Sequence, residues 1–117
     1  MKWSDERMAA SKDLVQKMVD AIVTEVAPEQ VYVFGSVARG EPAEGSDVDI
    51  LIVEREPFGP ERSRLQETNR VYRALSQFRV PTDVLVYSTE EFAKWSDSLN
   101  HVIGRCQREG RLLYARH

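Results

Sequence analysis

With 117 residues, of which 42% are hydrophobic and 30% charged, the chain is long enough for one core but not for two, and its composition excludes a disordered protein. The formal net charge of -3 argues against broad docking on a polynucleotide, which needs a dense field of Lys and Arg. Because there is one cysteine, Cys106, no leader-like N-terminus and no apolar run of about 20 residues, we expect a single domain over residues 1–117 in the cytoplasm, with neither a disulfide nor a membrane span.

The first predicted element is an amphipathic helix over about residues 5–27, and a short strand follows it. Apolar residues recur at spacings of three and four through this segment, which is the periodicity of a helix with one buried face. Pro28 ends the pattern because it cannot continue a helix. Residues 31–34 are β-branched and aromatic, and they predict a buried strand that enters a tight turn at Gly35 and Ser36.

A second strand and a second helix are expected after a polar loop. Residues 40–46 are rich in turn formers and predict an exposed loop, and residues 47–54 predict the strand. Pro60 is typical of the first turn of a helix, so we expect a helix over residues 61–78. The residues of this helix that are expected to face the core are Leu65, Val71, Tyr72, Leu75 and Phe78.

The last third of the chain predicts one more strand and two helical segments. Residues 84–87 form an apolar strand preceded by Asp83, and residues 88–91 have the spacing of a capping box that opens the next helix. A final helix over about residues 98–108 is followed by an apolar tail at residues 112–114. The element order predicts a small α/β or α+β domain.

Three carboxylates stand where the apolar pattern of the strands would not place them. Asp47 and Asp49 open the second strand and Asp83 opens the third, although Asp disfavours strands. Since residues two apart in a strand point to the same face, Asp47 and Asp49 should project side by side. If the strand of Asp83 is their neighbour, all three carboxylates converge. The alternative reading, a set of exposed turn carboxylates, is disfavoured by the joint pattern of these acids with the Gly-Ser turn.

Three convergent carboxylates need a cation, because like charges at close range raise one another's pKa. Their hard oxygen atoms, with no accompanying cluster of His or Cys, favour Mg²⁺ or Mn²⁺ over zinc. Mg²⁺ is commonly held by one or two carboxylates while the phosphates of a substrate complete its shell. The acids therefore indicate phosphate chemistry.

The turn after the first strand supplies the second half of the predicted site. Gly35 lets the backbone approach a ligand closely, and Ser36 adds a hydroxyl donor. A turn that leads into a helix offers unpaired N–H groups and the positive end of the helix dipole, which suit a triphosphate. Arg39 reads equally well as a phosphate contact and as a solvated arginine.

Together these features resemble the minimal nucleotidyltransferase family of the DNA polymerase β-like superfamily. The resemblance is carried by residues 35–40 (GSVARG), 46–50 (SDVDI) and 82–86 (TDVLV), and it spans the whole chain in length and element order. It implies a mixed β-sheet flanked by helices, two Mg²⁺ ions, and ATP or another nucleoside triphosphate as the substrate.

The resemblance also implies a role for each site residue. Asp47 and Asp49 match the family's paired metal ligands, and Asp83 matches its third carboxylate, at the metals and near the acceptor hydroxyl. Gly35 and Ser36 match the turn that holds the triphosphate. In such a site an acceptor hydroxyl attacks the α-phosphorus in line and releases pyrophosphate.

Members of the resembled family are often partnered with a HEPN-domain protein in toxin–antitoxin modules, where the nucleotidyltransferase adenylylates a toxin tyrosine. We therefore expect a magnesium-dependent enzyme that moves AMP from ATP to such a partner. A non-catalytic nucleotide-binding antitoxin that neutralises its partner by contact is an alternative, which the intact acids disfavour. Transfer to an antibiotic or another small hydroxyl compound is a third reading, although it usually calls for an added substrate domain. The oligomeric state is left open.

Several other distinctive side chains are read as structural. His101 and His117 lack partners with catalytic spacing and read as surface residues. Cys106 reads as a small core or interface residue, and Trp95 as a packing residue. The arginines around the second predicted helix read as a solvated face, and they are Arg62, Arg64, Arg70, Arg73 and Arg79.

Overall fold

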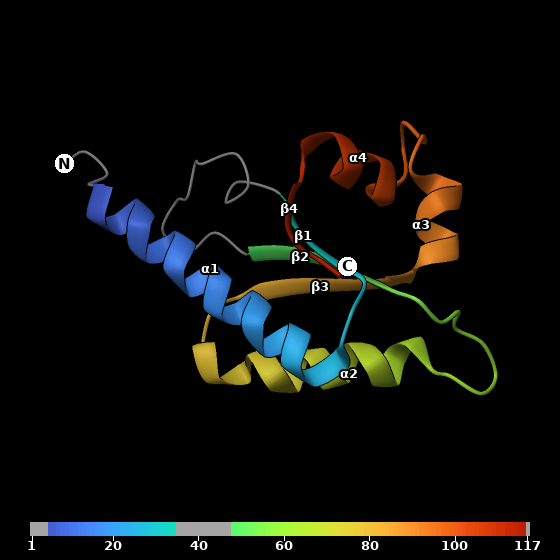
Figure 1. Ribbon diagram of the computed structural model, residues 1–117, viewed down its shortest axis with the longest axis horizontal. Helices are drawn as coiled ribbons and strands as arrows, with labels where there is room; N and C mark the ends of the chain where they lie inside the picture. Colours follow the sequence, from blue (N-terminus) through green and yellow to red (C-terminus); the bar gives the residue numbers. More distant parts are fainter. Residues whose placement is uncertain (1–4, 35–47, 117) are drawn as a thin grey trace.

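A computed structural model describes residues 5–34 and 48–116, with side chains from residue 12 onwards. In these ranges the chain forms one mixed sheet with helices on both faces (Figure 1), which confirms the predicted fold class. None of the described helices combines the length and the apolar character needed to cross a membrane. The element order is α1 (Asp5–Val26), β1 (Gln30–Phe34), β2 (Val48–Glu54), α2 (Arg64–Leu75), a 3-10 turn η1 (Ser76–Phe78), β3 (Thr82–Ser88), α3 (Thr89–Trp95), α4 (Val102–Glu109) and β4 (Arg111–Ala115).

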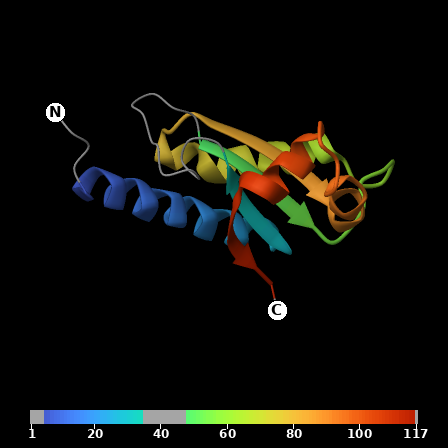
Figure 2. The same ribbon diagram turned by 90° about the horizontal axis from the view of Figure 1, so that it is seen from above.

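The sheet has the strand order β3-β2-β1-β4 and contains both pairing directions. β1 pairs antiparallel with β2 and with β4, whereas β2 and β3 are parallel. A parallel pair needs a crossover connection, and α2 lies in the one between β2 and β3. β3 and β4 are therefore the two edge strands of the described sheet, as Figure 2 shows.

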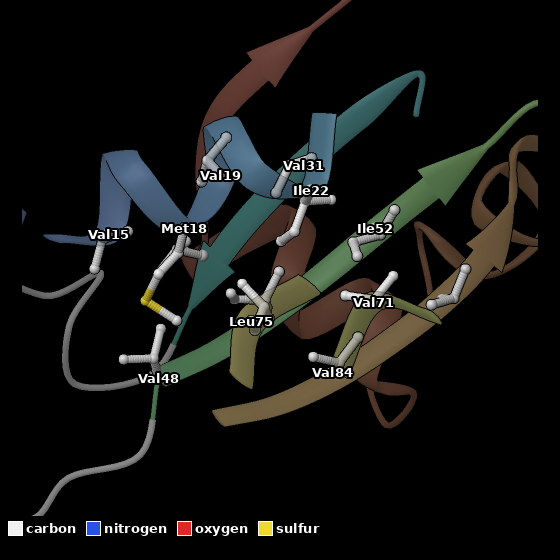
Figure 3. Close-up of a cluster of buried hydrophobic side chains, with 13 residues drawn as sticks. Val15, Met18, Val19, Ile22, Val31, Val48, Ile52, Val71, Leu75 and Val84 are labelled. Carbon is white, nitrogen blue, oxygen red and sulfur yellow. The ribbon is translucent and has the colours of Figure 1, made fainter. Parts of the chain in front are cut away.

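One face of the sheet packs against α1 and α2 and holds the larger apolar core. Figure 3 shows side chains of both helices directed at the strands, and every second strand residue faces them. The buried residues of this first core are Val15, Met18, Val19 and Ile22 of α1, Val71 and Leu75 of α2, and Val31, Val33, Val48, Ile50, Ile52, Val84 and Val86 of the strands.

The other face of the sheet packs against α3 and α4 around a smaller core. The strand residues of this second core alternate with those of the first, as the period of two requires. Among the described helices, α3 and α4 lie towards the C-terminal ends of β2 and β3 and leave the starts of both strands uncovered (Figure 2). The buried residues of the second core are Tyr32, Leu51, Val53, Ile103 and Cys106.

Two predicted helix boundaries are confirmed. α1 ends at Val26, because Ala27 adopts a left-handed φ of 47° and Pro28 follows it. At the start of α3, the Ser88 hydroxyl accepts a hydrogen bond from the Glu91 N–H at 3.1 Å, and Glu91 Oε1 accepts one from the Ser88 N–H at 2.9 Å. This reciprocal pair is the predicted capping box.

The predicted start of the second helix was wrong. α2 begins at Arg64, after Ser63, whose hydroxyl accepts a hydrogen bond from the Gln66 N–H at 3.1 Å. Pro60 lies instead at the tip of a tight turn, because Gly59 and Arg62 exchange backbone hydrogen bonds across it at 3.0 and 3.1 Å. Proline suits both a turn and a first helical residue, so the sequence alone could not separate the two.

Two residues of α2 that we expected in the core are exposed. Leu65 has 70% of its surface exposed and Tyr72 has 39%, whereas Val71 and Leu75 are buried. α2 packs on the sheet beside the edge strand β3 as well as on α1, so only a narrow stripe of its surface is covered. The apolar periodicity of the sequence predicted a wider buried face than α2 has at this edge of the sheet.

The end of the chain also differs from the prediction. The final helix, α4, begins at Val102 rather than near residue 98, and His101 caps it. Residues 111–115 are not a tail but the edge strand β4, which pairs with β1 with a bulge at Val31 and Tyr32. A run of three apolar residues beside arginine carries little strand signal by itself, and its pairing partner lies far away in the sequence.

Candidate functional site

Asp49 and Asp83 lie side by side on neighbouring strands. They are Cα partners in the parallel pairing of β2 with β3, and neighbouring strands are about 4.8 Å apart. Val48, Ile50 and Val84, which adjoin them in sequence, belong to the first core. Both aspartates therefore belong to the opposite face of the sheet. The strands of Asp49 and Asp83 are thus neighbours, as a convergence of these carboxylates requires.

The sheet face around the two carboxylates is open among the described residues. Asp49 is half-buried and Asp83 is exposed. The next residues along the same face, Leu51 and Leu85, lie in or against the second core under α3 and α4. Among the described residues, the acids thus stand at the border of the apolar layer.

Backbone contacts fix the starts of both strands. The Val48 N–H donates to the Pro81 carbonyl oxygen at 2.9 Å, just ahead of the two acids. On the other side of β2, Asp49 is the pairing partner of Phe34, the last residue of β1. Phe34 is also the last described residue before the predicted Gly-Ser turn, which lies outside the described ranges.

Four of the predicted site residues lie outside the described ranges, namely Gly35, Ser36, Arg39 and Asp47. Their roles stay predictions. Within residues 5–34 and 48–116, no group of three His, Cys, Asp or Glu side chains could hold a metal ion. The described part of the predicted carboxylate set is the pair Asp49 and Asp83.

This pair has the chemistry that a hard divalent cation needs. Mg²⁺ binds oxygen ligands at about 2.0–2.1 Å and commonly takes one or two carboxylates together with substrate phosphates. Two aspartates in register on adjacent strands supply oxygen atoms from a common direction. Among the described residues, no helix covers the sheet face beside them.

A second group of charged side chains lies at the other end of β2, and sequence reasoning missed it. Glu54 is only 3% exposed and pairs with Arg62, which also reaches Glu67 at 3.4 Å. Burial raises the pKa of Glu54 to about 8, and the neighbouring Glu67 adds to the rise while Arg62 opposes it. No local pattern marks this cluster, because its members come from a strand, a turn and a helix.

Three arginines that we read as part of a solvated face form ion pairs with carboxylates, namely Arg62, Arg64 and Arg70. The Arg64 guanidinium donates to the Val86 carbonyl oxygen at 2.7 Å and to Glu91 Oε1 at 3.1 Å, and it lowers the pKa of the Glu91 carboxyl. Arg70 pairs with Glu25 of α1 at 2.9 Å. The reading was wrong for Arg62 and Arg64, which are half-buried, whereas Arg70 is exposed, as expected.

His101 and Cys106 have structural positions on α4. The Nδ1 atom of His101 accepts a hydrogen bond from the Ile103 N–H at 3.1 Å, and its ring stacks on Trp95 with centroids 4.7 Å apart. His101 is therefore a helix cap rather than the surface residue that we expected. Cys106 is buried in the second core, as expected, and burial raises the pKa of its thiol to about 12. Such a thiol is not a nucleophile at neutral pH.

Residues 15–108 match the sequence family described as "Nucleotidyltransferase domain". A search of curated proteins gave no match.

The fold is similar to those of several solved structures. A protein from Sulfolobus solfataricus described as a candidate nucleotidyltransferase has a TM-score of 0.64 at 24% identity, over 95% of this chain and 86% of that chain. A toxin–antitoxin structure solved with AMP-PNP has a TM-score of 0.57 at 16% identity, over 87% of this chain and 74% of that chain. The MntA-HepT toxin–antitoxin structure has a TM-score of 0.52 at 15% identity, over 89% and 73%. At these identities the likeness shows a shared fold.

Proposed function

Because the chain belongs to the nucleotidyltransferase domain family, we propose that it moves AMP from ATP to a hydroxyl group of a HEPN-domain partner protein. The observation that carries the proposal is the pair Asp49 and Asp83, in register on adjacent strands at an open face of the sheet. A site that pairs carboxylates without a described His or Cys cluster suits a metal-bound phosphate better than a zinc or thiol chemistry.

The three acids hold the metal and the acceptor. Asp47 and Asp49 bind divalent cations, and Asp83 completes the metal site and orients the acceptor hydroxyl. Mg²⁺, when bound, neutralises phosphate charge and lowers the pKa of that hydroxyl. The acceptor oxygen then forms a bond to the α-phosphorus, the bond from that phosphorus to the bridging oxygen breaks, and pyrophosphate leaves. Asp83 or solvent takes the hydroxyl proton.

The nucleotide is held by the turn after β1. Gly35 permits close approach of the backbone to the triphosphate, and Ser36 donates to a phosphate oxygen. Arg39 adds a cation to the same phosphates. Phosphoryl chemistry of this kind needs mainly alignment and charge neutralisation, so a small scaffold with few functional groups is sufficient.

A protein acceptor is favoured by two features. The described residues form one sheet with two helical layers. None of the described helices covers the acids, which suits a side chain presented by another molecule. Two of the similar structures are toxin–antitoxin complexes, and one of these was solved with AMP-PNP, an analogue of ATP.

The test is transfer of label from α-³²P-ATP, with Mg²⁺, to a candidate HEPN-domain protein. The wild type is compared with Asp49→Asn and with Asp97→Asn, an exposed aspartate after α3 that serves as the matched control. We expect Asp49→Asn to lower the transfer rate by about 100-fold or more, and Asp97→Asn to leave it unchanged.

Label transfer and neutralisation of the partner separate the alternatives. If wild type and Asp49→Asn neutralise the HEPN protein equally and neither transfers label, the protein acts by contact and the enzymatic proposal fails. Label that appears on a small hydroxyl compound but never on protein would instead move the acceptor to the small-molecule class.

A further inference from the structure

The strand that carries Asp83 is an edge strand, and α2 supports its outer side. Among the described strands, β3 pairs only with β2, so the outward N–H and C=O groups of β3 need partners from elsewhere. Two side chains of α2 bind two of these groups. Tyr72 Oη accepts a hydrogen bond from the Val84 N–H at 3.0 Å, and Arg64 donates to the Val86 carbonyl oxygen at 2.7 Å.

The Tyr72 contact is the one next to the candidate site. The Val84 N–H belongs to the peptide group that joins Asp83 to Val84. On the inner side of β3, the register places Asp83 opposite Asp49. The short segment that bears the Asp83 side chain is therefore held by β2 on one side and by the Tyr72 hydroxyl on the other.

Burial does not explain a tyrosine at this position. Tyr72 is 39% exposed, whereas the preceding residue, Val71, is fully buried and supplies the packing of this turn of α2. The hydroxyl, by contrast, makes a defined contact with the strand. The feature of Tyr72 that acts on β3 is thus its oxygen atom.

We propose that Tyr72 is a positioning residue for Asp83, because its hydroxyl holds the edge strand in the place that sets the Asp83 carboxylate beside Asp49. The inference rests on the proposed function in one respect, since it takes Asp83 as a metal ligand. Mg²⁺ and Mn²⁺ sites of this kind need oxygen atoms placed within a few tenths of an ångström, and an unsupported edge strand does not hold a side chain so closely.

The test is a double-mutant cycle read by Mn²⁺ affinity in the presence of AMP-PNP, which needs no acceptor. Tyr72→Phe removes the hydroxyl and keeps the ring. We expect it to weaken Mn²⁺ binding by about 3- to 10-fold, at or below the low end of the range for residues that contact a metal ligand directly. In the Asp83→Asn background the same change should have no further effect, because the residue being positioned is gone. Tyr114→Phe, on the other edge strand, is the matched control and should bind as the wild type does.

Hydrogen exchange at the Val84 amide gives a second readout, which should become faster in Tyr72→Phe but not in Tyr114→Phe. The inference is overturned if Tyr72→Phe weakens Mn²⁺ binding equally with and without Asp83, or leaves both Mn²⁺ binding and Val84 exchange unchanged. It is overturned as well if Asp83→Asn binds Mn²⁺ like the wild type. Since the cycle does not involve transfer, a failure of label transfer is seen separately from a failure of this inference.

Discussion

Glu54 is a carboxylate that the fold places almost wholly out of water, at the end of β2 far from Asp49. Its pKa is about 8, against 4.5 for an ordinary Glu, mainly because burial penalises its charged form. In the unfolded chain the same group releases its proton near pH 4.5. Between these two values the native state holds one proton more than the unfolded state, so the free energy of unfolding falls as pH rises through this interval.

We therefore predict that Glu54→Gln removes part of the pH dependence of stability. For the wild type, this group lowers the free energy of unfolding by at most about 1.4 kcal/mol for each pH unit between about 4.5 and 8, and has no further effect above. Glutamine cannot titrate, so the variant should show a flatter profile and match or exceed the wild type at pH 8.5. Urea unfolding at several pH values measures this.

Glu56→Gln provides the control for that comparison. Glu56 lies two residues further on, its side chain is 77% exposed, and its carboxylate lies 3.9 Å from the same Arg62. The closer contact of Arg62, at 2.8 Å, is to the Glu56 backbone carbonyl oxygen, which the substitution keeps. Its removal should leave the pH profile of stability as it is. A Glu54→Gln profile as steep as that of the wild type would show that Glu54 is ionised in the folded protein.

At the scale of single residues, the sequence predicted the candidate site carboxylates better than it predicted side-chain contacts. The strand-opening positions of Asp49 and Asp83 could be recognised because a period of two and a poor strand former are local signals. Arg64 was misread because its ion pair with Glu91 depends on how α2 and α3 meet, and His101 because its stack on Trp95 depends on how the chain folds back between α3 and α4. Such contacts have no local signature.

At the scale of elements, Gly104 in α4 shows packing overriding helix propensity. Alanine is normally better than glycine inside a helix by about 1 kcal/mol. A Cβ atom at Gly104, however, would lie 1.8 Å from the Ser98 carbonyl oxygen, which is a clash with the backbone of the preceding turn. Ser98 cannot move freely, since the Arg108 guanidinium also binds its carbonyl oxygen at 2.9 Å.

We predict that Gly104→Ala destabilises the protein by about 1–3 kcal/mol, the usual cost of overpacking, rather than stabilising it. The clash should displace α4 from the second core and shift the midpoint of urea unfolding downwards. Gly59→Ala is the comparison, because a Cβ atom there would have nothing within 4 Å. Equal stability of Gly104→Ala and the wild type would mean that the turn before α4 yields easily.

The elements themselves were predictable where the signal is local. The end of α1 before Pro28 and the capping box of α3 follow from residues adjacent in sequence. The start of α2 was misplaced because Pro60 fits both a turn and a helix. β4 was missed because an edge strand is defined by its partner, and β1 lies far from β4 in the sequence.

At the scale of the whole molecule, the sheet keeps the candidate site carboxylates apart from the buried carboxylate of Glu54. Asp49 and Glu54 stand at opposite ends of β2, about 17 Å apart at 3.3 Å per residue. One face carries the first core under α1 and α2, and the other carries the second core and then Asp49 and Asp83. Changes at the two ends of β2 should therefore affect stability additively.

The last prediction concerns how a ligand at one end of the sheet acts on the unfolding of the whole fold. Mg²⁺ with AMP-PNP should raise the thermal midpoint of the wild type, by an amount equivalent to about 2.7 kcal/mol at 100 times the dissociation constant, because the unfolded chain has no assembled site. EDTA should reverse the rise. Asp49→Asn should lose most of it, and Asp97→Asn should keep it.

Glu54→Gln tests whether the two ends of β2 affect stability independently. If they do, this variant keeps the full stabilisation by Mg²⁺ and AMP-PNP while its pH profile is flattened, since nothing at Glu54 takes part in binding. Differential scanning calorimetry of wild type and Glu54→Gln at pH 6 and 8, with and without ligand, measures both effects together. A smaller ligand stabilisation in Glu54→Gln would mean that β2 transmits changes along its length. The effects on stability of changes at its two ends would then not be additive.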